Sequence, residues 1–241
     1  MIRFYAPDIE SDPVLPEAES AHCVRVLRMR EGDTLEIVDG KGGLYSCVLK
    51  SARPKAAEVE ITSKSTLDRH WKPEIIIAVA PTKNTDRMEW LAEKATEIGV
   101  DKLVFLNCER SVRKTTKPDR IEKILVSAMK QSLKALKPEL EVDVPILEFI
   151  DDCSKLDAIK YVGYCDASVE RRDFSACYSG QENVVILIGP EGDFSPSEIK
   201  AAISAGFIPV TFGDTRLRTE TAALFALCAT HTLIDRFESG R

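Results

Sequence analysis

The sequence lacks the short motifs that mark the commonest ligand sites. It contains no GxGxxG and no GxxxxGK[ST] segment, which disfavours a dinucleotide site and a P-loop. Its seven cysteines include no CxxC pair and its three histidines are scattered, which disfavours a disulfide framework and a zinc site. The longest apolar runs, residues 75–80 and 184–188, are too short to span a bilayer. We therefore expect a globular protein with buried free thiols, no metal and no membrane partner.

An apolar signal segment is also missing from the first residues. Acidic residues follow Phe4 quickly, at Asp8, Glu10 and Asp12, so we expect the protein to stay in the cytoplasm. The net charge of −6 at first argues against a nucleic-acid partner. However, residues 108–137 hold nine Lys and Arg against three Asp and Glu. Such a local basic patch attracts phosphate even on an acidic protein, although a solvated helix face has the same composition.

The pattern of short elements divides the chain into two domains, residues 1–68 and 74–241, joined by a polar linker. The first domain has a helical pattern at 18–29, and its strands are expected at 3–6, 34–38, 44–50 and 56–63. Short strands with tight turns are typical of a small β-barrel.

Strands alternate with helices in the second domain. Strands are expected at 75–80, 103–107, 146–150, 161–165, 184–188 and 207–212. Helices are expected at 86–98, 118–136, 195–205 and 219–237. This alternation predicts an α/β fold with a parallel sheet covered by helices.

A glycine-containing loop, residues 188–193, directly follows a buried strand. Loops in this position form the ligand crevices of α/β proteins, and its two glycines allow close approach to the backbone. A tight turn between strand and helix explains the same residues equally well. Ser195 and Glu198 predict a capping box at the start of the next helix.

A second loop, residues 213–221, also lies between a strand and a helix. Thr219 is expected to cap the helix, and Glu220 lies in its first turn, where the helix dipole favours a negative charge. Arg216 and Arg218 flank Leu217. Two arginines are more than capping requires, so this loop is a second candidate for a functional site.

Together, these two segments resemble the paired signature of the SPOUT RNA methyltransferases. Residues 188–199 read IGPEGDFSPSEI, and residues 217–224 read LRTETAAL. More narrowly they resemble the RsmE family, which methylates N3 of a uridine in 16S ribosomal RNA. Further matches include residues 22–27 with Gly32-Asp33, residues 83–99, Glu109-Arg110-Ser111 and Lys130-Gln131-Ser132. The family often has glycine where this chain has Asp193.

The resemblance implies a PUA-like RNA-binding β-barrel followed by a SPOUT domain, whose chain forms a trefoil knot. It implies a homodimer with the active site at the interface, S-adenosyl-L-methionine as cofactor, and ribosomal RNA or the small ribosomal subunit as partner. No metal is required. A site with few charged groups is expected, because arginine would repel the sulfonium of the donor.

The site residues implied by the resemblance fall into three groups. The catalytic candidates are Arg218, Glu220 and Glu191. The donor is expected to contact Leu187, Ile188, Gly189, Gly192, Thr211, Phe212, Gly213, Leu217 and Thr219. The RNA is expected to contact Arg25, Arg28, Arg30, Arg110, Arg113 and Lys134.

Two other functions remain open from the sequence. The first is a ribosome-assembly protein that binds RNA without catalysis. The second is a SPOUT methyltransferase that acts on another RNA. A nucleotide-binding α/β enzyme is more distant because the phosphate-binding motifs are missing.

Overall fold

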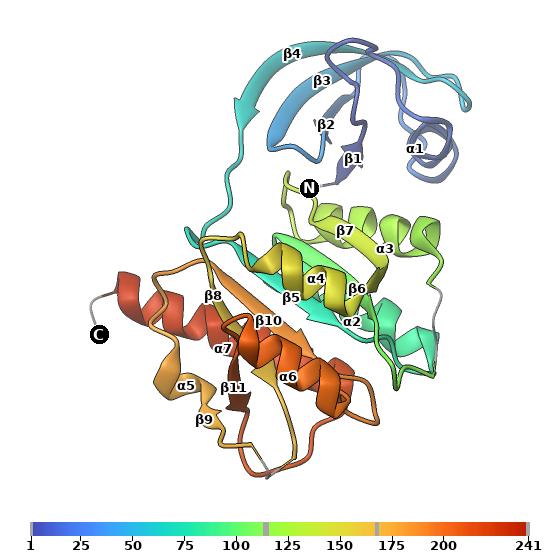
Figure 1. The fold of residues 1–241 in the computed structure, drawn as a ribbon. Coiled ribbons are helices and arrows are strands. Elements are labelled where there is room, and N and C mark those ends of the chain that lie inside the picture. Colours follow the sequence, from blue (N-terminus) through green and yellow to red (C-terminus); the bar gives the residue numbers. More distant parts are fainter. Residues whose placement is uncertain (1, 113–115, 167–168, 240–241) are drawn as a thin grey trace. The chain divides into compact units, whose positions relative to one another are not determined.

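The computed structural model describes residues 2–112, 116–166 and 169–239, which form two compact units (Figure 1). The first unit comprises Met1–His70 together with Leu125–Lys137. The second comprises Trp71–Ile124 and Pro138–Arg241. The sequence pattern assigned residues 125–137 to the second domain, whereas in the structure they pack with the first unit. Within the described residues, every helix falls short of the length and apolarity needed to cross a bilayer.

One mixed sheet forms the centre of the first unit. Its strands are β1 (Arg3–Tyr5), β2 (Thr34–Val38), β3 (Gly43–Ser51) and β4 (Glu58–Thr66), in that spatial order. β1 pairs in parallel with β2, and the other pairs are antiparallel. The unit buries residues that alternate along the strands, such as Leu35 with Ile37 and Cys47 with Leu49. Alternation of this kind places apolar side chains on one face of a sheet.

The helix expected at 18–29 is shorter and less regular than predicted. α1 (Glu17–Ala21) continues directly into a π-helical turn, η1 (His22–Val26). The helix then ends because Arg28 adopts a left-handed conformation with a φ of 56°. Arg25 in this turn and Arg28 after it are both exposed.

Residues 125–137 complete the core of the first unit. Met129 and Ala135 form a buried cluster with Val38 of β2. Lys130 forms an ion pair with Glu19 of α1, and both side chains are largely buried. A segment that follows the second unit's early strands in the chain thus supplies part of the core of the N-terminal unit.

The second unit is built on a seven-stranded parallel sheet with the order β7-β6-β5-β10-β8-β11-β9. The strands are β5 (Ile75–Val79), β6 (Lys102–Asn107), β7 (Glu139–Pro145), β8 (Ile159–Gly163), β9 (Arg172–Asp173), β10 (Val184–Ile188) and β11 (Ile208–Thr211). β5 and β10 are buried at every position, which explains their unbroken apolar sequences. Because all the strands are parallel, their carboxyl ends lie along one edge of the sheet.

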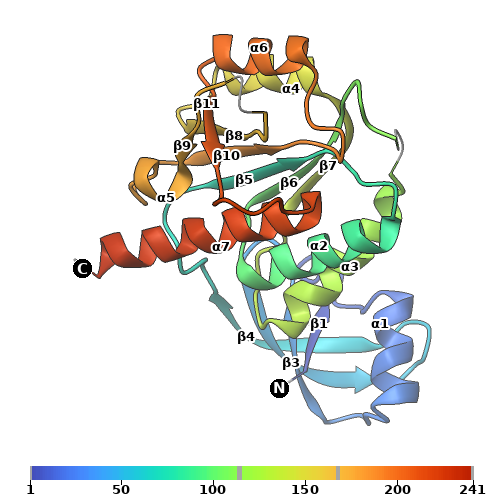
Figure 2. The same ribbon diagram turned by 90° about the horizontal axis from the view of Figure 1, so that it is seen from below.

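Helices cover both faces of this sheet (Figure 2). α4 (Ile146–Cys153) and α6 (Pro196–Ser204) lie on one face and contact each other. α2 (Thr85–Ile98) and α7 (Thr219–Glu238) lie together on the other face, and α7 contacts β5 and β10. α3 (Pro118–Gln131) and the short α5 (Phe174–Cys177) complete the helices. This arrangement confirms the predicted α/β class.

The prediction of a strand at 146–150 was wrong. The strand of this region is β7, which ends at Pro145, and residues 146–153 form α4. The buried residues of α4 are Ile146, Phe149, Ile150 and Cys153, a spacing of three and four residues that is typical of one helix face. Leu147, by contrast, points to solvent and is 56% exposed. A run of five residues was too short to reveal this periodicity.

Candidate active site

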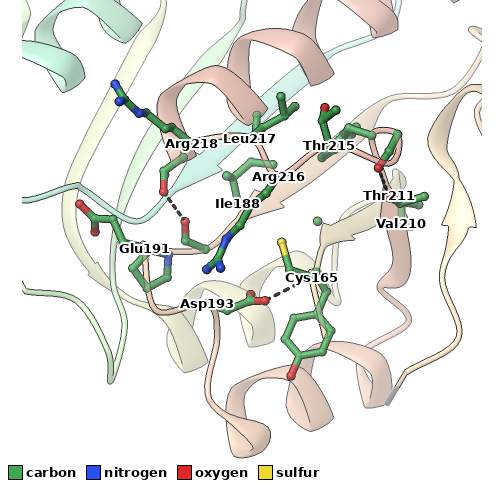
Figure 3. A pocket seen from close by; sticks show the side chains of 18 of the residues that line it. Cys165, Ile188, Glu191, Asp193, Val210, Thr211, Thr215, Arg216, Leu217 and Arg218 are labelled. Carbon is green, nitrogen blue, oxygen red and sulfur yellow. Dashed lines mark hydrogen bonds between the residues drawn. The ribbon is translucent and has the colours of Figure 1, made fainter. Parts of the chain in front are cut away.

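The two segments singled out by the sequence lie side by side at the carboxyl edge of the sheet. One follows β10 and the other follows β11. The hydroxyl of Thr219 donates a hydrogen bond to the carbonyl oxygen of Gly189 (3.0 Å), which joins them directly. Both segments line one cavity of about 850 Å³ (Figure 3). The predicted juxtaposition of the two segments is therefore confirmed.

Most of the residues predicted for the site line this cavity. They are Ile188, Gly189, Glu191, Thr211, Phe212, Gly213, Leu217, Arg218, Thr219 and Glu220. Two others do not line it. Leu187 is fully buried in the core beneath the sheet edge, and the carbonyl of Gly192 accepts a hydrogen bond from Arg110 (3.0 Å).

A third segment, after β8, also lines the cavity and was missed. It contributes Gly163, Tyr164, Cys165, Asp166 and Arg171. β8 lies between β10 and β11 in the sheet, so its end must approach both predicted loops. The sequence does not show which strands are neighbours, and no motif marks this segment.

The cavity is more highly charged than expected. Four arginines (Arg87, Arg171, Arg216 and Arg218) and five acidic residues (Asp166, Glu191, Asp193, Asp214 and Glu220) line it. The expectation of few charged groups was wrong. Because the acidic residues slightly outnumber the arginines, the cavity can accept a cationic ligand.

Glu220 has an unusual environment for a carboxylate. The residue is 5% exposed and lies in the first turn of α7. Its Oε1 lies 3.5 Å from Nε of Arg87 on α2, and its Oε2 is buried without a hydrogen-bond partner. Buried polar atoms are normally paired. A ligand in the cavity could supply the missing donor.

Arg218 is exposed at the N-cap of α7. The sequence predicted Thr219 as the cap, but Thr219 is the first helical residue and its hydroxyl is used by Gly189. Arg218 thus lines the cavity with a side chain that is also open to solvent.

Glu191 braces its own loop. Its Oε1 accepts a hydrogen bond from the backbone N–H of Lys83, in the segment after β5 (3.1 Å). The side chain is exposed. This contact gives Glu191 a structural role, because it holds the loop after β10 against the segment after β5.

The loop after β6 is fixed to the loop after β10 by two charged side chains. Nη1 of Arg110 donates to the carbonyl oxygens of Gly192 (3.0 Å) and Phe194 (3.3 Å).

The predicted capping box is confirmed, since Ser195 and Glu198 exchange hydrogen bonds at the start of α6. The other oxygen of Glu198 accepts the N–H of Glu109 (2.7 Å). Arg110, predicted to bind RNA, thus also holds the wall of the cavity.

The remaining residues predicted to bind RNA belong to the first unit or are not described. Arg25, Arg28 and Arg30 are exposed in and after η1. Lys134 follows α3 and is partly buried. Arg113 lies outside the described residues. Across the described ranges, no cluster of three His, Cys, Asp or Glu side chains is arranged to hold a metal ion.

A parallel sheet with a glycine-lined, charged cavity at its carboxyl edge, preceded by a small β-rich unit, defines an α/β protein that binds a small polar ligand. The comparisons with known proteins give the particular family. The RNA methyltransferase domain family matches residues 69–231, and the RNA methyltransferase PUA domain family matches residues 15–62. The chain belongs to the RNA methyltransferase family of the RsmE type, which confirms the resemblance seen in the motifs.

Solved and curated relatives align over nearly the whole chain. A probable rRNA-methyltransferase from Porphyromonas gingivalis is 45% identical with a TM-score of 0.92, covering 98% of this chain and 100% of that one. Ribosomal RNA small subunit methyltransferase E from Neisseria gonorrhoeae, solved with S-adenosylmethionine, is 29% identical with a TM-score of 0.83, covering 97% and 98%. The curated enzyme of the same name from Mycobacterium bovis is 28% identical, covering 97% and 91%.

Proposed function

We propose that this protein transfers a methyl group from S-adenosylmethionine to N3 of a specific uridine in small-subunit (16S) ribosomal RNA. The observation that carries the proposal is the single cavity formed by the segments after β10 and β11 in an RNA methyltransferase domain. Relatives named ribosomal RNA small subunit methyltransferase E, one of them solved with S-adenosylmethionine, support the RNA class and the donor. A putative methyltransferase from Legionella pneumophila, solved with SAM, also supports the donor.

The residues present fit this donor. The volume of about 850 Å³ lies within the range of sites for ligands of this size. Gly163, Gly189 and Gly213 line the cavity, so backbone groups can approach an adenine edge without an intervening side chain. A Cβ atom added to Gly163 would lie 2.9 Å from the ring of Phe212, so a larger residue at this position would collide with a side chain that lines the cavity.

The donor supplies an electrophilic methyl group on a cationic sulfur. We assign the backbone of residues 188–191 and 211–219 to holding it, with Ile188, Phe212 and Leu217 covering its apolar parts. Positioning of this kind supplies a large part of the rate of a displacement reaction.

The acceptor nitrogen must lose a proton, and the negative charge that results spreads onto the base oxygens. Arg218 is assigned to stabilising that charge or to holding a phosphate, because it is exposed at the rim of the cavity. Glu220 is assigned to accepting the proton or to orienting a donor group, because one of its oxygens is buried and unpartnered. Glu191 is assigned to bracing the loop.

RNA binding is assigned to the exposed arginines of the first unit, Arg25, Arg28 and Arg30, with Lys134, Arg110 and Arg113 adding phosphate contacts. The target base must leave its stack to reach the donor.

The proposal includes a cytoplasmic homodimer and a knotted SPOUT chain. Apolar side chains exposed on the α2–α7 face, Trp90 (46%) and Phe225 (49%), support a second copy on this face. The location of the enzyme follows from its substrate, the small ribosomal subunit.

Mass spectrometry of nucleosides from 16S rRNA tests the proposal. Cells without the gene should lack one 3-methyluridine, and the gene or the purified protein with S-adenosylmethionine should restore it on small subunits. A full complement of 3-methyluridine in 16S rRNA without the gene would refute this substrate. A nucleoside lost from another RNA would point to the related enzyme with a different target.

A further inference from the structure

Asp193 connects two walls of the cavity from a backbone conformation that few residues adopt. Its φ is 59°, in the left-handed region. Its Oδ1 accepts the N–H of Phe194 (2.8 Å), and its Oδ2 accepts the N–H of Cys165 (2.9 Å). Cys165 lies 28 positions earlier, in the segment after β8. The second bond therefore fastens the segment after β8 to the loop after β10 (Figure 3).

The backbone of Cys165 is held from both sides. Its N–H is bound by Asp193, and its carbonyl oxygen accepts a hydrogen bond from Nη1 of Arg171 (3.0 Å). Arg171 also binds the carbonyl oxygen of Tyr164 (3.1 Å). Arg171 belongs to the same segment as Cys165, so it shapes that segment internally. Asp193 fixes the segment against the loop after β10, while the N–H of Tyr164 donates to the carbonyl oxygen of Val210 on β11 (3.3 Å).

We propose that Asp193 is a positioning residue for the methyl donor: its ionised carboxylate sets the spacing between the segments after β8 and β10 and provides negative charge for a cationic ligand. This inference rests on the proposed function, because it takes S-adenosylmethionine as the occupant of the cavity. An ionised carboxylate accepts stronger hydrogen bonds than a neutral one. Protonation of Asp193 would weaken both contributions at once.

The surroundings of Asp193 make its protonation easier than usual. Burial raises the pKa of Asp193 above its ordinary value, against the opposing effects of its two N–H donors and Arg110. Asp166 raises the pKa further. Asp193 in turn raises the pKa of Tyr164 and of Cys165. Two cationic groups, Arg216 and Arg171, lower the pKa of Cys165.

Donor affinity should therefore fall as the pH drops through the pKa of Asp193, because the ionised form binds the cation better. Because the pKa of Asp193 is raised, this loss of affinity should occur at a pH above the ordinary aspartate pKa of about 3.9. Asn cannot titrate, so the D193N variant should lose this part of the pH dependence.

Calorimetric titration with S-adenosylmethionine tests the inference in the whole protein. The D193G variant removes the carboxylate and accepts the left-handed backbone without strain. D143G is its matched control, because Asp143 has a φ of 58° and its carboxylate also accepts a backbone N–H, that of Thr116 (2.9 Å). Asp143 lies on β7, at the far edge of the sheet from the cavity.

We expect D193G to bind the donor roughly five- to tenfold more weakly and D143G to bind it like the wild type. D193N keeps an acceptor oxygen and should bind with intermediate affinity, with a flatter pH profile than the wild type. Equal affinities for D193G and D143G, or the same pH slope in D193N and the wild type, would overturn the inference. A wild type that binds no donor would refute the proposed function instead.

Alkylation of Cys165 gives a second readout that needs no donor. Cys165 is accessible to solvent, but the surrounding protein partly desolvates its thiol and raises its pKa, and the charge of Asp193 raises this pKa further. Removal of the charge in D193N should therefore speed the reaction of Cys165 with iodoacetamide, measured by peptide mass spectrometry. An unchanged rate would show that the negative charge of Asp193 does not reach Cys165, and would overturn the electrostatic part of the inference. This measurement also decides the question if D193G fails to fold.

Discussion

The hydroxyl of Thr219 and the carbonyl oxygen of Gly189 form a 3.0 Å hydrogen bond between residues thirty positions apart. Gly189 is the first residue after β10, and Thr219 is the first residue of α7. Thr219 is 6% exposed, so this bond is shielded from water. It fixes the start of the last helix to the end of a central strand.

Thr219→Val should weaken both the fold and the donor site. Valine keeps the shape of the side chain but leaves the Gly189 carbonyl without its donor, at a cost of about 1–3 kcal/mol. We expect a lower urea midpoint and a roughly fivefold loss of affinity for S-adenosylmethionine by calorimetry. Thr219→Ser keeps the hydroxyl and is the control. Equal donor affinity in the two variants would mean that the bond does not shape the cavity.

Arg218→Ala should abolish methylation without unfolding the protein. The side chain is exposed and makes no capping hydrogen bond in α7, so the melting temperature should change little. Arg218→Lys keeps the charge but not the planar guanidinium, and we expect it to restore only part of the activity. Nucleoside mass spectrometry on small ribosomal subunits measures both. Normal turnover by the alanine variant would remove Arg218 from the mechanism.

Glu220→Gln should lower turnover while leaving donor binding largely intact. Glutamine preserves the size of the side chain but cannot take a proton, and a general base contributes about 10²–10⁴ in rate. The control is Glu191→Gln, which retains an oxygen for the N–H of Lys83 and should be nearly silent. Single-turnover rates and calorimetry separate the two effects. If both variants methylate RNA at the wild-type rate, Glu220 has only a structural role.

Glu198→Ala should destabilise the second unit strongly. One carboxylate oxygen accepts the N–H of Ser195 and the other accepts the N–H of Glu109, both at 2.7 Å. Glu198 is 4% exposed, and its removal leaves the buried N–H of Ser195 and the partly buried N–H of Glu109 without their acceptor, which costs about 2–4 kcal/mol in total. Glu198→Gln keeps an acceptor for only one of the two N–H groups, so its stability should lie between those of the wild type and the alanine variant. Urea unfolding measures the series, and a loss below about 1 kcal/mol for alanine would contradict this account.

The sequence predicted the parts of the fold that have a strong periodic or motif signal. The buried strand Val184–Ile188, the capping box at Ser195 and the two loops of the cavity all follow from local pattern. Local pattern does not report which strands are neighbours. For that reason the segment after β8, including Cys165, was missed although it completes the cavity.

Two other differences have simple physical causes. α4 was taken for a strand because its apolar run is short and its helical spacing shows only when Cys153 is included. The charge of the cavity was underestimated because the expectation came from the positive charge of the donor, although six of the nine charged side chains belong to the two predicted loops. Arg87, Asp166 and Arg171 come from elements outside these loops. Arg87 reaches Glu220 only because α2 and α7 lie together on one face of the sheet.

The packing of Leu125–Lys137 with the first seventy residues makes the N-terminal unit discontinuous in the chain. An excised fragment of residues 1–70 would lack Met129 and Ala135 and would expose Val38, which is fully buried in the intact protein. The N-terminal unit therefore cannot be transplanted as a simple module of the first seventy residues. Its folding must wait until the ribosome has synthesised the first two strands of the second unit's sheet.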